Sequence, residues 1–271
     1  MGDVLHKALL GFFGFVAVAI SCGASAVVAQ TPSRAPVFKQ LRLDGNFVRW
    51  PRQDASASLV LTYKVLEGFQ SFDGARNCKR MTDIGAVTER SHIERTVFDA
   101  ELRAALAMWE AAADIRFREA EADEVPNISI GAQAEPEGWA FADVFYNRAD
   151  PDVVKPISRS LVCLNPNKAW KIGFDGDLRV YDLRYTLAHE IGHAIGLDHP
   201  NAPGQIMGYR YEESFRELQA GDLSGAVALY GPSRGVTMAS KPEPDRNPQA
   251  SAEADAEPTG STSRALVPNG K

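Results

Sequence analysis

The sequence has few cysteines and histidines and no run of positive charge. Only three cysteines and five histidines occur among its 271 residues. No cysteine belongs to a CxxC pair or adjoins a histidine, so neither a thiol nucleophile nor a cysteine-based metal site is expected. The formal net charge is -6 and the basic residues are scattered, which argues against a nucleic-acid partner. No EF-hand or other ordered acidic loop occurs, so a calcium requirement stays unknown.

The N-terminal region has the pattern of an export signal. Lys7 precedes an apolar run over residues 8–20, and small residues follow as far as Ala29. Cleavage after Ala29 would make residues 1–29 a signal peptide and would place the mature protein outside the cell or in the periplasm. Two alternatives stay open: an uncleaved membrane anchor, because no charge lies between Lys7 and Arg34, and a lipid anchor at Cys22. We expect no other attachment to a membrane.

We expect the rest of the chain to consist of three parts. From about Lys241 the composition shifts to proline, acidic and small residues, so we expect residues 236–271 to be a disordered tail. Residues 58–235 have a normal length for one folded domain, and residues 30–57 form an N-terminal segment before it.

Within residues 58–235, apolar residues recur with the periods of strands and helices. Alternation over residues 59–65 predicts a first strand. A stripe with helical spacing over residues 98–109 predicts a long helix, with Thr96 as its N-cap. Short strands are expected at 115–117, 127–130, 139–146 and 160–164, before a second helix that contains residues 183–195. This order predicts an α+β domain.

The stretch HEIGHAIGLDH, from His189 to His199, has the ligand spacing of a catalytic zinc site. On a helix, the rings of His189 and His193 leave the same face and can bind one metal ion. Gly196 permits a backbone conformation that ends the helix, so His199 can return as a third ligand. Three protein ligands leave one coordination position open, as in catalytic rather than structural sites. The sequence therefore predicts one zinc ion bound by His189, His193 and His199.

Glu190, next to the first ligand, is the candidate catalytic residue. Zinc lowers the pKa of its bound water toward neutrality, and Glu190 can act as the general base that takes the proton. A zinc-binding module without catalysis, serving the envelope or adhesion, is the alternative. The presence of a residue placed to act as the base argues against it.

Two further segments resemble parts of the metzincin clan of zinc endopeptidases, and of its matrixin family in particular. Residues 205–209, QIMGY, resemble the Met-turn, in which Met207 would lie beneath the zinc site. Residues 218–231 resemble the closing helix of matrixins, which ends in LYG. The resemblance implies a metzincin-type catalytic domain at 58–235, with a mixed twisted sheet, an early long helix, an active-site helix and a C-terminal helix. It implies a secreted metalloendopeptidase that hydrolyses proteins or peptides, and we expect a monomer.

A segment at residues 138–142 resembles the edge strand of matrixins. An extended substrate would lie against this strand through main-chain hydrogen bonds, at Trp139, Ala140, Phe141 and Ala142. Phe141 stands where matrixins have a histidine ligand of a second, structural zinc. Besides the three motif histidines, only His6 and His92 occur, so a second zinc site is not expected.

Two tyrosines follow the proposed Met-turn. Tyr209 matches the position from which astacins and serralysins supply a tyrosine to zinc or to the oxyanion, where matrixins usually have proline. Tyr211 matches the tyrosine in the wall of the matrixin specificity pocket. A phenol near a metal can donate to developing negative charge, so Tyr209 is a supporting candidate, with ordinary packing as the alternative.

Cys78 and Cys163 are the cysteines that remain after the signal peptide. In an oxidising compartment such a pair is expected to form a disulfide. Two thiols buried in unrelated places are the alternative.

Overall fold

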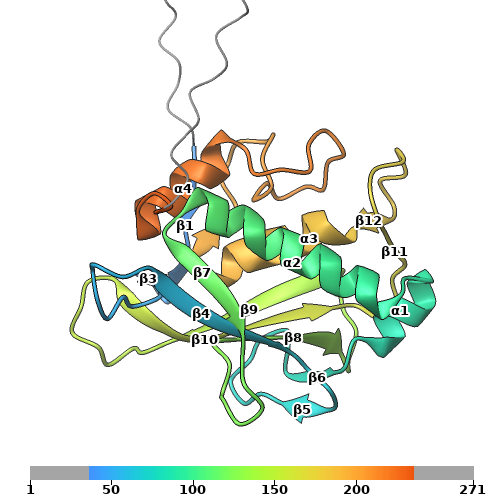
Figure 1. Cartoon of the computed structure of the whole chain (residues 1–271), viewed down its shortest axis with the longest axis horizontal. Coiled ribbons are helices and arrows are strands. Elements are labelled where there is room, and N and C mark those ends of the chain that lie inside the picture. The colour runs from blue at the N-terminus through green and yellow to red at the C-terminus, as the bar shows by residue number, and fades with distance from the viewer. Residues whose placement is uncertain (1–36, 235–271) are drawn as a thin grey trace, which may run out of the picture. The chain divides into compact units, whose positions relative to one another are not determined.

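The computed structural model describes residues 37–234, in which four helices accompany a nine-stranded mixed sheet (Figure 1). The helices are α1 (Gly85–Ser91), α2 (Arg95–Ala112), α3 (Leu183–Ala194) and α4 (Ala220–Tyr230). The strands of the main sheet are β2 (Arg42–Leu43), β3 (Asn46–Arg49), β4 (Leu59–Val65), β5 (Gln70–Ser71), β6 (Arg80–Thr82), β7 (Ile115–Glu119), β8 (Ile128–Gln133), β9 (Ala140–Tyr146) and β10 (Lys155–Leu164). Two small sheets pair β1 (Lys39–Gln40) with β13 (Leu197–Asp198), and β11 (Trp170–Lys171) with β12 (Tyr181–Asp182).

The α+β class predicted from the sequence is confirmed, with one short helix, α1, ahead of the expected long one. Nowhere between residues 37 and 234 does a helix combine the length and the apolar character needed to span a membrane. The predicted signal peptide (1–29), the candidate lipid anchor at Cys22 and the predicted tail (236–271) lie outside the described residues.

Strand β10 organises the part of the sheet that borders the site. It pairs in parallel with β8 and with β3, and antiparallel with β9. On the far side of β8 lies β4, which pairs in parallel with both β8 and β7. Among the described strands β9 pairs with β10 alone, so one of its edges is left without a strand partner.

Both faces of the sheet are covered, as the alternation along β10 shows. Val162 and Leu164 pack into the main core together with residues of α2 and α3. Leu161 and Cys163 point the other way, into a second cluster built by residues 66–81. All six residues of β8 are buried, and a Cβ on Gly131 would lie 2.5 Å from the carbonyl oxygen of Thr82. Close packing from residues 66–82 therefore requires glycine at this point of β8.

Helix α2 lies against α3, and Figure 1 shows the two crossing the same face of the sheet. Trp109 of α2 is fully buried, and its Nε1 donates to the carbonyl oxygen of Ala188 in α3 at 2.9 Å. The helix begins at Arg95 with Glu94 in an extended conformation at the N-cap, so the prediction of Thr96 as the N-cap is wrong. The carbonyl oxygen of Glu94 accepts the backbone N–H groups of Val97 and Phe98, so the helix starts two residues earlier than predicted.

The segment before residue 58 packs on the same core. Trp50 is buried, its Nε1 donates to the carbonyl oxygen of Ala194, and its backbone N–H donates to the hydroxyl of Tyr230. The backbone N–H of Leu41 donates to the carbonyl oxygen of Gly196 at 2.8 Å. Residues 37–57 therefore support the end of α3 and the turn that follows it.

Candidate metal centre

Helix α3 carries the first two histidines of the motif. Its N-cap is Asp182, whose carboxylate accepts the backbone N–H of Tyr185 at 2.8 Å. Leu187 and Ile191 are fully buried in the core, which fixes the rotation of the helix and presents His189 and His193 to the cleft.

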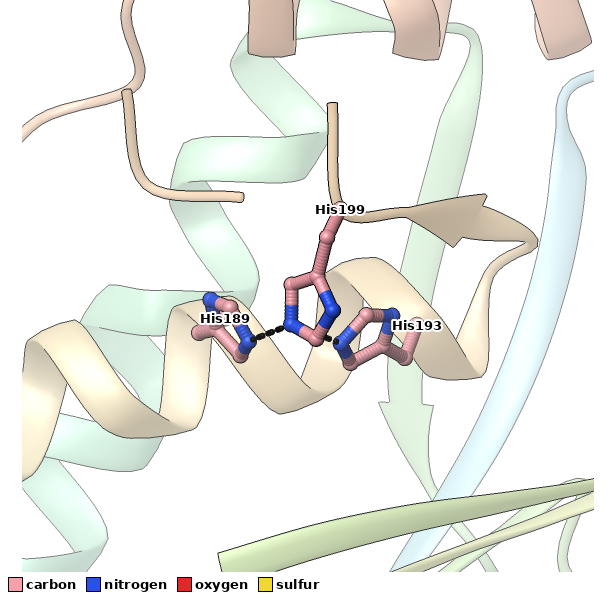
Figure 2. A group of neighbouring side chains, drawn as sticks. All are labelled: His189, His193 and His199. Carbon is pink, nitrogen blue, oxygen red and sulfur yellow. Dashed lines mark hydrogen bonds between the residues drawn. The ribbon is translucent and has the colours of Figure 1, made fainter. Parts of the chain in front are cut away.

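Gly196 ends this helix and returns the chain. Its φ of +105° is one that residues with side chains rarely adopt, and a Cβ there would lie 3.0 Å from the carbonyl oxygen of Val48. The chain then forms β13 and brings His199 back over α3, as Figure 2 shows. The turn expected at Gly196 is thus the one that the structure contains.

The three imidazoles converge on one point (Figure 2). Nε2 of His199 lies 3.0 Å from Nε2 of His189 and 3.2 Å from Nε2 of His193. Zinc binds histidine nitrogen at about 2.0–2.1 Å, which separates tetrahedral ligand atoms by about 3.3 Å. The candidate ligand atoms of all three residues lie within 4.8 Å of one another, so the group has the right size for one zinc ion. Among residues 37–234 this is the one group of potential ligands with such spacing.

The other ring nitrogens hold two of these histidines in the ligand form. Nδ1 of His189 donates to the carbonyl oxygen of Ile206 at 2.7 Å, and Nδ1 of His193 donates to that of Leu197 at 2.8 Å. Each bond leaves the Nε2 lone pair directed at the centre. Burial lowers the pKa of His193 to about 4 and that of His189 well below its ordinary value, which favours the neutral imidazole that a metal requires. The donor set therefore fits zinc.

The turn at residues 205–208 supports the centre from below. Met207 is 2% exposed, and a Cβ on Gly192 of α3 would lie 2.2 Å from its sulfur, so turn and helix are in close contact. Asp222 of α4 is buried and accepts the backbone N–H groups of Ile206 and Met207 at 2.9 and 3.0 Å. Burial raises the pKa of Asp222, although its backbone donors oppose the rise. Sequence reasoning did not single out Asp222; the available signal was its place three residues after Gln219, in a capping box.

Glu190 lies beside the first ligand and lines the cleft. Its side chain is 6% exposed, and it has no ion pair or side-chain hydrogen bond within residues 37–234. Burial raises the pKa of Glu190 to about 8, and the positive charge of a bound zinc would act in the opposite direction. A carboxyl group in this setting can both accept and release a proton near neutral pH.

A cleft of about 550 Å³ runs past the centre, with β9 along one side. The histidines, Glu190 and the strand residues Ala140 to Phe145 all line it, and so does Trp139 just before the strand. The structure thus brings the expected edge strand to the metal centre. Leu41 and Leu43 of the N-terminal segment line the cleft too, which the sequence did not suggest.

Aromatic side chains form one end of this cleft. Trp139 stacks on Tyr181 with ring centroids 4.0 Å apart, and Tyr181 stacks on Tyr211 at 4.3 Å. The Tyr211 hydroxyl accepts the backbone N–H of Asp182 and donates to Glu213, so Tyr211 is fixed within the wall. Tyr209 differs, because it is 81% exposed and its ring meets the edge of the His199 ring at 5.2 Å between centroids.

At the other side of the sheet, a disulfide joins Cys78 to Cys163 of β10. Both cysteines are fully buried in the second cluster. Phe141 packs against this cluster, so in this chain an aromatic side chain in β9 contributes to a core rather than to a metal site.

Comparison with known proteins agrees with this geometry. The family model described as Matrixin matches residues 82–231, more than half of the chain. The chain is similar to Stromelysin-2 of Rattus norvegicus, with 25% identity over 198 residues, which covers 69% of this chain and 40% of that protein. It is also similar to Matrix metalloproteinase-16 of Homo sapiens, with 36% identity over 84 residues, or 29% of this chain and 13% of that protein.

The chain thus spans less than half the length of these relatives. The matched region contains α2, the complete zinc motif, the turn at Met207 and α4 through Gly231. Its three histidines have the ligand geometry that such a motif requires. The chain belongs to the matrixin family, and His189, His193 and His199 form the site of its catalytic zinc ion.

Proposed function

We propose that this chain is an exported zinc endopeptidase that hydrolyses peptide bonds in proteins or peptides. The observation that carries the proposal is the convergence of three imidazoles in a cleft, next to a buried carboxyl group and an unpaired strand edge. A mature protein that begins after Ala29 and acts as a monomer outside the cell or in the periplasm is part of the proposal.

Glu190 is proposed as the general base. A bound zinc ion supplies a Lewis acid and lowers the pKa of a water molecule toward neutrality. The carboxylate of Glu190 takes a proton from the attacking water and delivers it to the leaving amine nitrogen.

Strand β9 is proposed as the platform for the substrate. Its free edge offers backbone N–H and C=O groups, to which an extended peptide can add as a further strand. Trp139, Ala140, Phe141 and Ala142 lie at the end of β9 where the aromatic wall begins. A side chain next to the scissile bond would then lie against the part of the cleft that Tyr185, Thr186 and Tyr211 line.

Zinc content and proteolysis together test this function. Protein from Gln30 onward is expected to bind one zinc per chain and to cleave casein or quenched peptides. Glu190→Gln is expected to lower kcat by about 10²–10⁴-fold without loss of zinc, because the base is removed and the ligands remain. Glu89→Gln, in the exposed part of α1, is the matched control and should retain activity.

Each result has a separate meaning. Full activity of Glu190→Gln would refute the role of this residue. Stoichiometric zinc with no cleavage of any substrate would favour the non-catalytic zinc module. A folded protein that binds no zinc would refute the metal site itself.

A further inference from the structure

A loop outside the zinc motif reaches the same cleft. We call residues 72–79 the clasp loop; it lies between β5 and β6, and its residues Gly74, Arg76 and Asn77 line the cleft. The other lining residues nearby are Asp143, Val144 and Phe145, in the second half of β9. The clasp loop therefore borders the cleft at the opposite end of β9 from Trp139 and the aromatic wall.

Polar contacts attach the clasp loop to β9. The carboxylate of Asp143 is 8% exposed and accepts the backbone N–H groups of Asn77 and Cys78 at 2.7 and 2.8 Å. It also accepts the side-chain amide of Asn77 at 3.1 Å. The disulfide between Cys78 and Cys163 fastens the loop to β10, the neighbouring strand.

Apolar contacts hold the other end of the clasp loop. Phe72 and Ala75 are buried in the second cluster, and the guanidinium of Arg159 lies over both Phe72 and Phe145. Backbone bonds from Phe72 to Lys79 and from Ala75 to Phe72 close the turn. Arg76 therefore projects from a loop that is fixed on both sides.

The charge of Arg76 is uncompensated within the cleft. Four charged residues line the cleft besides the histidines: Arg76, Asp143, Glu190 and Asp198. Asp143 accepts hydrogen bonds from the clasp loop, Asp198 forms an ion pair with Lys39 at 2.6 Å, and Glu190 lies at the metal centre. Arg76 is exposed, and its guanidinium has no ion pair or hydrogen bond within residues 37–234.

From this arrangement we infer that Arg76 binds an acidic side chain of the substrate and selects peptides with Asp or Glu a few residues from the scissile bond. The inference rests on the proposed peptidase function. A peptide paired with β9 advances about 3.3 Å per residue, so the run from Ala140 to Phe145 accommodates about five substrate residues. Arg76 lies near Asp143, which is in the second half of β9, and its guanidinium would contact a substrate side chain a few residues from the scissile bond. It can bind the carboxylate of that side chain through two N–H groups.

The test compares peptides that differ in one charge. Quenched peptides carry Glu, Gln or Lys in turn at each of four positions on either side of the scissile bond. Wild-type protein is expected to favour Glu over Gln at one position by about fivefold in kcat/KM, as an exposed ion pair provides, and the preference should shrink at high salt. Arg76→Glu is expected to reverse the preference at that position toward Lys.

Lys79→Glu is the matched control. It makes the same change in net charge on the same loop, but Lys79 does not line the cleft, so the preference for Glu should persist. An identical Glu-to-Gln ratio in wild type and Arg76→Glu at every position would overturn the inference.

A binding measurement separates this inference from the proposed function. Fluorescence anisotropy with Glu190→Ala should show tighter binding of the Glu peptide than of its Gln partner, and Arg76→Gln in the same background should abolish the difference. If no peptide is cleaved, the proposed function fails, and the anisotropy still decides the role of Arg76. Equal binding of the two peptides by Glu190→Ala would refute it.

Discussion

Tyr209 combines a position beside the metal centre with an open environment. Its ring contacts His199 edge-on, while 81% of the residue is exposed to solvent. The hydroxyl has no hydrogen-bond partner within residues 37–234, so it is free to donate to a substrate. Tyr211, two residues on, has its hydroxyl occupied on both sides and serves the wall.

We therefore expect Tyr209→Phe to lower kcat by about tenfold, with KM and zinc content nearly unchanged. A fully enclosed oxyanion donor contributes about 10²–10³-fold, and an exposed phenol should contribute less. Steady-state kinetics on a quenched peptide will measure the change. Tyr63→Phe, on β4 and away from the cleft, is the control, and equal kcat in both variants would show that the Tyr209 hydroxyl has no role in catalysis.

At the residue scale, the zinc ligands could be predicted from sequence because their spacing is local. His189 and His193 are one helical turn apart, and a single glycine turn brings back His199. Arg76 could not be predicted, because nothing near it in the sequence indicates a cleft. Its position depends on Asp143, which lies more than 60 residues away in the chain.

Among the elements, α4 fixes the turn beneath the zinc site through one side chain. Asp222 accepts the N–H groups of Ile206 and Met207 and caps its own helix through Gln219. The carbonyl oxygen of Ile206 in turn receives Nδ1–H of His189. A continuous series of hydrogen bonds thus runs from the first turn of α4 to a zinc ligand.

Asp222→Asn should disrupt this series. One carboxylate oxygen becomes an NH₂ group that faces a backbone N–H, so at least one buried donor loses its partner. We expect the free energy of unfolding to fall by about 2–3 kcal/mol and zinc affinity to fall about tenfold. Urea unfolding and competition with a zinc chelator measure the two effects. Glu217→Gln, an exposed neighbour, should change neither, and unaltered zinc affinity in Asp222→Asn would contradict the coupling.

Long periodic elements were predictable, whereas short ones were not. The strand at 59–65 and the helix that contains residues 98–109 have clear apolar patterns, and both occur. Strands β5 and β6 have two and three residues, and β5 is exposed, so they have no such pattern. Their pairing is stabilised by contacts with β8 and by the buried Met81, which are non-local.

Across the whole molecule, Asp114 ties together the two ends of the described chain. It is 2% exposed and accepts the Arg52 guanidinium at 2.8 Å and the Ser58 hydroxyl at 2.6 Å. Arg234 also pairs with it, at 2.7 Å. Arg52 further donates to the carbonyl oxygen of Tyr230 at the end of α4. Burial alone would raise the pKa of Asp114, but these hydrogen bonds and positive charges together hold it below its ordinary value of 3.8.

Because of this lowered pKa, the free energy of unfolding should depend on pH. Because the pKa is lower in the folded than in the unfolded state, the contribution of Asp114 is fully present above about pH 4 and is lost as the pH falls through the folded pKa. Asp114→Asn should therefore destabilise the protein at pH 6, with a difference from wild type that shrinks toward pH 2. Urea unfolding across this range measures it. Asp123→Asn, in an exposed loop, should show little effect, and a difference independent of pH would refute the assignment.

The sequence separated residues 30–57 from the catalytic domain, whereas the structure packs residues 37–57 against it. Trp50 is buried through partners at Ala194 and Tyr230, which lie more than 140 positions away in the chain. Such long-range contacts cannot be inferred from the local spacing of apolar residues in the sequence.

The disulfide between Cys78 and Cys163 is expected to form late in the maturation of the protein. Cytosolic thiols are kept reduced, so on the proposed export route this bond forms only after the chain has left the cytosol. Until then the loop is attached to β9 by the hydrogen bonds of Asp143 and by the apolar contacts of Phe72. On the proposed function, the zinc site would therefore not depend on this bond, whereas the loop that carries Arg76 would be fully fixed only after export.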